Sequence, residues 1–336
     1  MDSLSQIALG AAVSVAVMGR RTAVWKAALW GAVAGTLPDL DVLIDQGDAI
    51  RNMVLHRAQS HALFWLTLFS LPFSALVARL HGEWGLLRRW WLALWLVLVT
   101  HPLLDAMTVY GTQLALPFSN YPFGVGSIFI IDPLYTLPLL VGVIWALASG
   151  TGPRGRVANV VGLLLSTGYL AWSFAAQQQV TQIAQAALVR QGIAAEHLLV
   201  TPTPFNTVLW RVVVVAGDDY LEGFYSLLDA QPQIEFDRFA KGNALAAELQ
   251  HIDGVQRLTA FTKGFYKLEQ RADRLLISDL RMGQEPNYSF SFAVAEEHSP
   301  TVALAQPEQI AAAFDIARGL NWLWRRAWGE RLAPPR

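Results

Sequence analysis

Apolar residues form long stretches in the first half of the chain, whereas in the second half they alternate with polar residues. A transmembrane helix needs about 20 mostly apolar residues. Six stretches approach or reach that length: 3–19, 22–37, 62–78, 90–110, 126–149 and 157–176. We therefore predict a membrane α-helical bundle of about six transmembrane helices over residues 1–178.

The remaining residues, 179–336, have the pattern of a soluble α+β domain. β-Branched or alternating stretches predict strands at 207–216, 220–227, 234–239, 274–280 and 288–294. Helical spacing predicts a stalk at 175–191 and helices at 244–251, 256–268 and 307–328. The last of these helices carries three tryptophans, and we expect it to pack on the sheet or to lie on the membrane surface.

The distribution of charge follows the same division. Residues 1–178 contain 10 Lys/Arg and 8 Asp/Glu, and residues 179–336 contain 15 and 18. The net charge of −1 and the absence of a dense basic run argue against nucleic acid as a partner. The chain has no cysteine, which excludes disulfides, thiolate metal ligands and a cysteine nucleophile.

Basic residues in the short connections predict how the bundle is inserted, because such residues concentrate on the cytoplasmic side. The connections on one side contain eight Lys/Arg, whereas the opposite connections, 38–61 and 111–125, contain only Arg51 and Arg57. We therefore predict a multi-pass protein of the bacterial inner membrane whose second set of connections lies outside. Six spans then place both chain ends, and the soluble domain, in the periplasm.

Seven acidic or imidazole side chains in or beside the apolar stretches fall on the predicted outer side. Ionisable groups at membrane depth are costly and usually functional. The group contains Asp39, Asp41, His56, His61, His101, Asp105 and Asp132. Taken alone, each has a structural alternative, such as a helix-ending turn for the first two aspartates or a hydrogen-bonded core histidine for His101. Their convergence on one side favours a shared site.

Imidazole and carboxylate together suit a divalent metal ion, and zinc fits this ligand set best. His101 and Asp105 lie four residues apart, so a helix presents both on one face. The predicted ligand set is Asp39, Asp41, His56, His61, His101 and Asp105. The predicted general base is Asp132, or whichever of the first two aspartates does not bind metal. We expect Arg57 to bind substrate.

Three short motifs resemble those of the YdjM-like family of bacterial inner-membrane proteins. They are Leu37-Pro38-Asp39-Leu40-Asp41, His56-Arg57 followed by Ser60-His61, and His101-Pro102-Leu103-Leu104-Asp105. The start of the chain is similar as well, and the resemblance covers about residues 1–178. It implies a membrane-embedded site formed by the histidines and aspartates of these motifs and a metal-dependent hydrolase activity. Gln6, a weaker ligand, stands where many relatives have a histidine.

These observations favour a hydrolase that cleaves an ester or phosphoester at the outer face of the membrane, with a membrane lipid or lipid-linked molecule as substrate. Two alternatives stay open. The same side chains can bind a passing ion in a transporter, although no second cluster lies toward the cytoplasmic side. Otherwise the protein is a non-enzymatic envelope protein whose soluble domain binds a partner, for example by strand addition.

Overall fold

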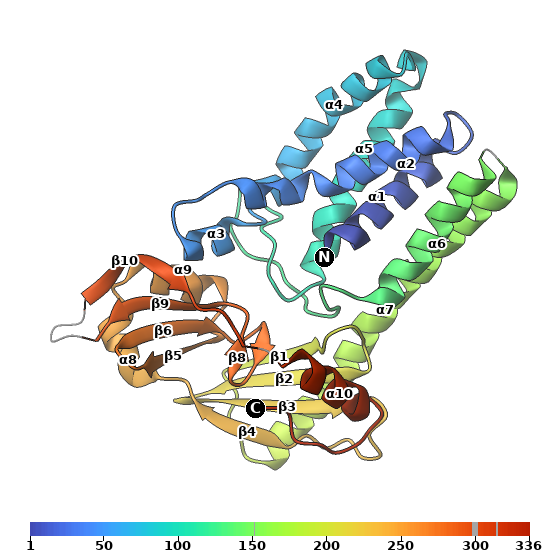
Figure 1. Cartoon of the computed structure of the whole chain (residues 1–336). Coiled ribbons are helices and arrows are strands. Elements are labelled where there is room, and N and C mark those ends of the chain that lie inside the picture. Colours follow the sequence, from blue (N-terminus) through green and yellow to red (C-terminus); the bar gives the residue numbers. More distant parts are fainter. Residues whose placement is uncertain (151, 298–301, 314) are drawn as a thin grey trace. The chain divides into compact units, whose positions relative to one another are not determined.

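The computed structural model describes residues 1–150, 152–297, 302–313 and 315–336, with helices in the first part and two antiparallel sheets in the second (Figure 1). The chain divides into two compact units. Unit 1 consists of Met1–Ile44 and Arg57–Phe174, and unit 2 consists of Asp45–His56 and Ala175–Arg336. A short segment from the first half of the sequence therefore packs with the second unit.

Unit 1 is built from apolar helices joined by short turns. Its helices are α1 (Ser3–Met18), α2 (Val24–Thr36), α4 (Leu63–Leu80), α5 (Leu87–Ala106), α6 (Pro133–Ser149) and the first part of α7 (Pro153–Arg190). Its 3-10 turns are η1 (Pro38–Leu43), η2 (Gln59–His61) and η3 (Trp84–Leu86). Each apolar stretch of the sequence corresponds to one helix. Among the described residues, α4 and α7 are both long and apolar enough to cross a membrane, so six spans stay a prediction.

Helices α1 and α2 pack through glycines. A Cβ built on Gly31 would lie 2.2 Å from the carbonyl oxygen of Gly10, and one built on Gly35 would lie 2.5 Å from the carbonyl oxygen of Gln6. Small residues allow this close approach of helix backbones in membranes. Both helices also pack on α5, so the last turn of α2 lies beside α5.

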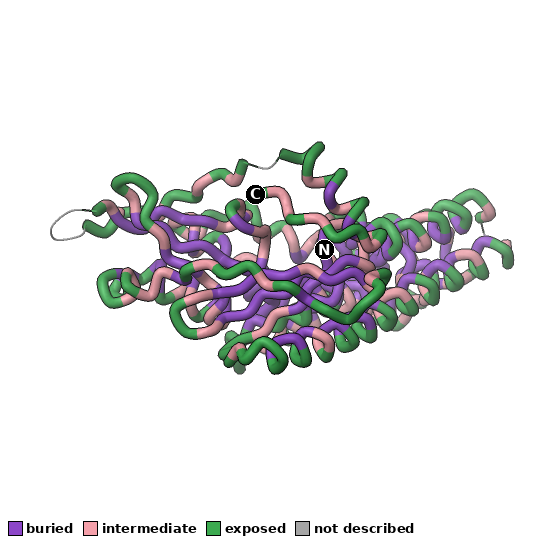
Figure 2. The backbone as a smooth tube through the Cα atoms, turned by 90° about the horizontal axis from the view of Figure 1, so that it is seen from below, coloured by how far each residue is buried: buried purple, intermediate pink, exposed green. Residues whose placement is uncertain are grey.

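Unit 2 contains two four-stranded antiparallel sheets, whose inner strands are largely buried, as the long purple stretches of Figure 2 show. The first has the order β1-β2-β3-β4, formed by β1 (His197–Pro202), β2 (Leu209–Ala216), β3 (Asp219–Ser226) and β4 (Phe236–Ala240). The second has the order β10-β9-β6-β5, formed by β5 (Tyr266–Arg271), β6 (Arg274–Asp279), β9 (Ser291–Glu296) and β10 (Val302–Gln309). A short ribbon pairs β7 (Gly283–Gln284) with β8 (Asn287–Tyr288).

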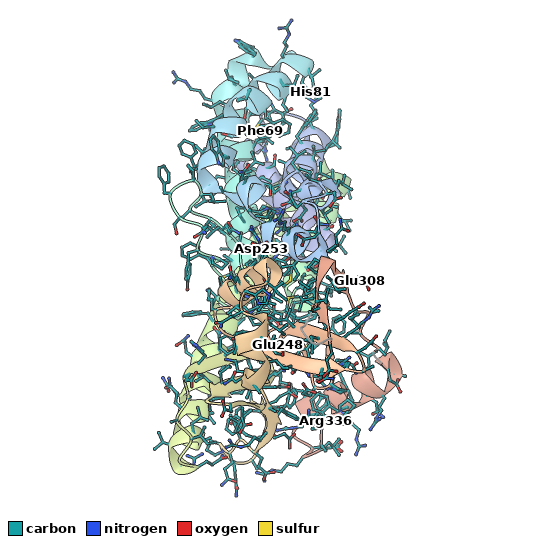
Figure 3. All side chains as sticks on the ribbon, turned by 90° about the vertical axis from the view of Figure 1, so that its left-hand side faces the viewer. Phe69, His81, Glu248, Asp253, Glu308 and Arg336 are labelled. Atoms are coloured by element: carbon teal, nitrogen blue, oxygen red, sulfur yellow. The ribbon has the colours of Figure 1, made fainter. Side chains whose placement is uncertain are left out.

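Four short helices complete unit 2. They are α3 (Ala49–Leu55), α8 (Asn243–Leu249), α9 (Asp253–Phe261) and α10 (Ile316–Ala327). Figure 3 labels Glu248 on α8, Asp253 on α9 and Glu308 on β10. The second half of α7 packs on the first sheet through Val180 and Ala184, which are fully buried.

Two helices predicted for unit 2 are wrong in part. The helix expected at 256–268 ends at Phe261, because Lys263 and Gly264 adopt positive φ angles of 55° and 86°, and β5 follows. Residues in this left-handed conformation commonly end helices. The helix expected at 307–328 is α10 alone, since β10 extends to Gln309. Pro307 is tolerated there because β10 is an edge strand.

The expectation that the tryptophan helix packs on the sheet is confirmed for one side chain. Trp322 of α10 is buried, and its ring centroid lies 4.9 Å from that of Phe224 on β3. Trp324 and Trp328 are exposed on the same helix.

Candidate metal centre

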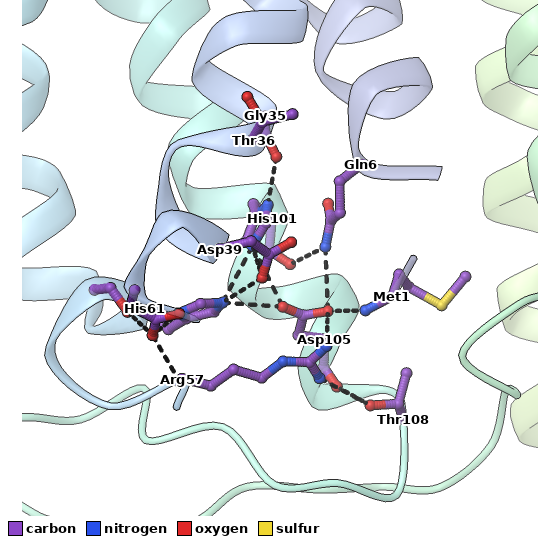
Figure 4. Close-up of polar contacts among 12 residues, drawn as sticks. Met1, Gln6, Gly35, Thr36, Asp39, Arg57, His61, His101, Asp105 and Thr108 are labelled. Carbon is purple, nitrogen blue, oxygen red and sulfur yellow. Dashed lines mark hydrogen bonds and ion pairs between the residues drawn. The ribbon is translucent and has the colours of Figure 1, made fainter. Parts of the chain in front are cut away.

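Four predicted site residues from three elements of unit 1 meet near the end of α2 (Figure 4). Asp39 comes from η1, His61 from η2, and His101 and Asp105 from successive turns of α5. One ligand atom from each lies within 4.8 Å of those of the other three. His61, His101 and Asp105 are buried, and Asp39 is partly exposed. These four side chains can hold a metal ion.

The spacing of the four atoms fits tetrahedral coordination. Nε2 of His61 lies 3.2 Å from Nε2 of His101 and 3.3 Å from Oδ1 of Asp39. Oδ2 of Asp105 lies 3.2 Å from Nε2 of His61 and 3.3 Å from Nε2 of His101. A fifth of the six separations, from Nε2 of His101 to Oδ1 of Asp39, is 3.5 Å. Ligand atoms about 2.0–2.2 Å from zinc at tetrahedral angles are separated by roughly 3.3–3.6 Å.

Hydrogen bonds on the far side of each ring direct Nε2 toward the centre. Nδ1 of His101 lies 2.7 Å from the carbonyl oxygen of Gly35, which can only accept, so Nδ1 carries the proton. Nδ1 of His61 lies 2.9 Å from Oγ of Ser60, and that hydroxyl donates to Oδ2 of Asp41 at 2.5 Å. Oγ of Ser60 therefore accepts from Nδ1 of His61. In the neutral rings both Nε2 atoms are then unprotonated.

The centre thus gathers four acceptors around one point. Oδ1 of Asp39 and Oδ2 of Asp105 are buried, and no hydrogen bond of good geometry reaches them from the described residues. A buried polar atom without a partner is costly. If one imidazole is protonated, its single N–H cannot satisfy the three acceptors that are left. If both are protonated, two N–H groups face each other across the 3.2 Å between the nitrogens and repel. A divalent cation satisfies all four atoms.

The carboxyl group of Asp39 is suited to this role. Burial alone would raise its pKa, but when the imidazoles of His101 and His61 are protonated, the hydrogen bonds that their Nε2 atoms donate outweigh burial and hold the pKa of Asp39 below its usual range. The side chain is therefore an ionised carboxylate at neutral pH, the form that binds metal.

The two oxygens of Asp105 have different surroundings. Oδ1 contacts the amino group of Met1, accepts from Nε2 of Gln6 at 3.2 Å and lies 3.4 Å from a guanidinium nitrogen of Arg57. Oδ2 is the atom that faces the two imidazoles. Gln6 also donates to the carbonyl oxygen of His101 at 3.2 Å, and its Oε1 is buried with no hydrogen-bond partner among the described residues.

Arg57 brings a buried positive charge next to the centre. Its backbone has a φ of 64°, and its N–H donates to Oδ2 of Asp41 at 2.9 Å. Its guanidinium lies 5.1 Å from the ring centroid of Tyr110 and donates to Oγ1 of Thr108 over a long 3.4 Å. Nε has no acceptor in the part of the chain that the structure describes. One donor of the guanidinium is therefore not used by the described residues.

Three other predicted residues lie outside the group of four, and their roles stay predictions. Oδ2 of Asp41 is 3.7 Å from Nδ1 of His61, so this aspartate supports the ring from the side opposite Nε2. His56 is the residue that ends α3 and belongs to unit 2. Asp132 caps the N-terminus of α6 by accepting from the N–H of Leu134, and its second oxygen accepts from the hydroxyl of Tyr169 at 2.9 Å.

Two residues that orient the imidazoles, Gly35 and Ser60, have no predicted role in the site. Gly35 stands four residues after Gly31, a spacing typical of close helix packing. Ser60 directly precedes His61. These patterns indicate helix contact and a turn, and the hydrogen bonds to the rings become visible only in the folded chain.

These features define a helical protein of membrane type with a buried histidine and aspartate centre. The model of the YdjM inner membrane protein family matches residues 1–180, which include all four acceptors. The chain therefore belongs to the YdjM inner membrane protein family, as the resemblance of its motifs predicted. The comparisons with curated proteins and with solved structures found no significant match.

Proposed function

We propose that this protein is a metal-dependent hydrolase of the bacterial inner membrane that cleaves an ester or a phosphoester. The observation that carries this proposal is the set of four mutually facing acceptors, with two imidazoles whose Nδ1 atoms are already occupied. Asp39, His61, His101 and Asp105 would hold the ion, and zinc suits two nitrogens and two carboxylate oxygens best. When bound, such an ion supplies Lewis-acid activation of water and of the substrate.

The other polar groups then have distinct tasks. The carbonyl oxygen of Gly35 and the Ser60–Asp41 pair keep the two rings in one tautomer, as second-layer groups do in metal sites generally. Arg57, whose Nε has no acceptor among the described residues, binds the anionic group of the substrate. Asp132 and Asp41, the two predicted aspartates outside the group of four, are the two proposed general bases.

The membrane setting supports a lipid or lipid-linked substrate. The motifs that carry the four acceptors lie at helix ends on the side with few basic residues, which we infer to be the outer face of the membrane. A site there lies at the depth of lipid headgroups. In this proposal the bundle crosses the membrane six times and the soluble domain is periplasmic.

The metal site can be tested by the metal content of the full chain purified in detergent. We expect the wild-type protein to retain about one ion per chain, and His61→Ala and His101→Ala to lose it, because each removes a ligand. His251→Ala is the matched control, since His251 is exposed on unit 2. A wild-type protein that binds no zinc, manganese or iron, or two variants that keep full occupancy, would exclude a metal site.

Activity separates the hydrolase from its alternatives. We expect the metal-loaded protein to hydrolyse a phospholipid or a lipid-linked phosphodiester in mixed micelles, and a chelator to stop the reaction. Bound metal without turnover, together with ion flux into liposomes, would instead support a transporter. A metal-free protein that captures a peptide through unit 2 would support the envelope-protein alternative.

A further inference from the structure

The segment that connects the first site motif to the second packs with unit 2, although the helices on either side of it in sequence belong to unit 1. Residues Asp45–His56 belong to unit 2, whereas Ile44 and Arg57, their covalent neighbours, belong to unit 1. Asp39 lies six residues before the segment, and His61 lies five residues after it. The chain therefore leaves the metal centre, enters unit 2 and returns to the centre.

Within unit 2, helix α3 of this segment packs against α9 and β10 (Figures 1 and 3). Ile50 of α3 has no exposed surface, and Met53 has 4%. A Cβ built on Gly254 of α9 would lie 2.9 Å from Cδ1 of Ile50 and 3.4 Å from Cγ of Pro307 on β10. The glycine thus leaves the space that Ile50 fills.

Polar contacts set the orientation of the same helix. Asp48 caps α3 by accepting from the N–H of Arg51 at 2.8 Å. The guanidinium of Arg51 lies 3.4 Å from Oδ2 of Asp253, an oxygen that also accepts from Arg257 at 2.7 Å. Because these side chains are exposed, the ion pairs add little stability. Burial of the apolar side chains Ile50 and Met53 is therefore the main favourable contribution to docking.

The return to the centre occurs at a constrained residue. Arg57 has the φ of 64° that side chains other than glycine rarely adopt. Such a conformation persists only where its surroundings impose it. Asp41 holds the N–H of Arg57 at 2.9 Å, and Gln113 donates to its carbonyl oxygen at 3.0 Å. On the other side of Arg57, the chain is held by α3 in unit 2.

We propose that the docking of α3 on α9 orders the segment 45–56, and that this ordering, passed on through the chain itself, restricts the adjoining residues Arg57 and His61. The proposal rests on the proposed function, since it concerns the same site. Released from α9, the segment 45–56 would be a flexible loop between two ligand motifs. The ordering of that loop would then have to accompany metal binding, at an entropic cost that docking removes.

The test changes unit 2 and leaves every site residue intact. Gly254→Leu in the full chain places a side chain where Ile50 packs. Gly319→Leu is the matched control, because it makes the same change in another helix of unit 2, at a position with no atom within 4 Å of the added Cβ. The measurements are the zinc dissociation constant, by competition with a chelating dye, and hydrogen exchange of residues 45–56.

We expect Gly254→Leu to accelerate exchange in α3 and to weaken zinc binding at least tenfold, with Gly319→Leu within twofold of wild type. Adding Ile50→Ala to Gly254→Leu should restore affinity, because the smaller side chain makes room for the leucine. Rescue of this kind would not follow from general damage to the fold.

Three results would overturn the proposal. The first is wild-type zinc affinity in Gly254→Leu with α3 released, the second is unchanged exchange in α3, and the third is a double variant no better than Gly254→Leu alone. Failure of the proposed function is a different result, since the wild-type chain itself would then bind no zinc.

Discussion

Nδ1 of His101 lies 2.7 Å from the carbonyl oxygen of Gly35, and this hydrogen bond connects helix packing to the candidate metal centre. Gly35 is also a point of close contact between α2 and the backbone of α1 at Gln6. Without a side chain, Gly35 lies directly against α1, while its carbonyl oxygen reaches His101 on α5. The tautomer and direction of the imidazole therefore depend on a residue that touches no ligand atom of the centre.

The first prediction concerns this relationship. Gly35→Ala would place a Cβ 2.5 Å from the carbonyl oxygen of Gln6, so α2 must shift and the hydrogen bond to His101 must lengthen. We expect zinc affinity to fall by about 10- to 100-fold, the range typical of lost second-layer contacts. Gly168→Ala in α7, with no atom within 4 Å of the added Cβ, should bind zinc as wild type does. Equal affinity in both variants would show that the carbonyl does not orient the ring.

The second prediction separates substrate binding from metal binding. Arg57→Lys keeps the charge but removes the planar donors available to an anionic group. We expect metal content to stay near one ion per chain while KM for the lipid phosphoester rises about tenfold or more. Arg154→Gln, a change at an exposed arginine of unit 1, is the control. If Arg57→Lys loses the metal and leaves KM unchanged, the role proposed for Arg57 is wrong.

The third prediction concerns the stability of unit 2. Glu285 is buried and accepts hydrogen bonds from Nζ of Lys267 at 2.6 Å and from the hydroxyl of Tyr220. Burial raises the pKa of Glu285, but these two hydrogen bonds outweigh it, so its pKa is below the ordinary value of 4.5. A lowered carboxyl pKa stabilises the fold above the unfolded-state value, and this contribution is lost as the pH falls through the folded-state pKa.

Glu285→Gln should therefore destabilise unit 2 by about 1–3 kcal/mol at pH 7, because Lys267 loses the nearer of its two carboxylate partners, Glu285 and Glu269. The difference from wild type should shrink as the pH falls below about 4.5. Thermal unfolding of the two proteins between pH 3 and 8 measures both effects. Glu248→Gln, at an exposed position on α8, should not differ from wild type. A pH-independent difference would assign the effect to packing and not to ionisation.

The fourth prediction concerns topology. Eight basic residues mark one set of connections and two mark the other, so six spans place the end of unit 2 outside the cytoplasm. Alkaline phosphatase fused after Arg336 should be active, and green fluorescent protein at the same position should be dark. The opposite pattern would mean an odd number of spans, with α1 or α2 as the helix that does not cross.

Local patterns were sufficient for the helices of unit 1 and for the chemistry of the centre. An apolar stretch buries or embeds its side chains whatever its neighbours are, so its position could be predicted from composition alone. His101 and Asp105 share a face because a helix repeats every 3.6 residues. The choice among six possible ligands could not be made in this way, since it depends on how three chain segments meet.

The secondary structure of unit 2 shows where local signals fail. The helix predicted over 307–328 starts only at Ile316, and Pro307 lies in β10, where it is tolerated because β10 is at the edge of its sheet. The positive φ angles of Lys263 and Gly264 end α9 where a helical pattern continues in the sequence. In both cases pairing with an adjacent strand, β9 for β10 and β6 for β5, competes with the helical conformation.

The sequence by itself determined that an apolar helical half precedes an α+β half and that histidines and aspartates gather at helix ends, because these follow from residue type and spacing. Only the tertiary structure decided that Asp39, His61, His101 and Asp105 face one another, that Gly35 and Ser60 orient the rings, and that α3 packs with unit 2. Each of these depends on contacts between residues far apart in the chain. Such contacts have no periodicity in sequence, since they arise from the close packing of complementary surfaces.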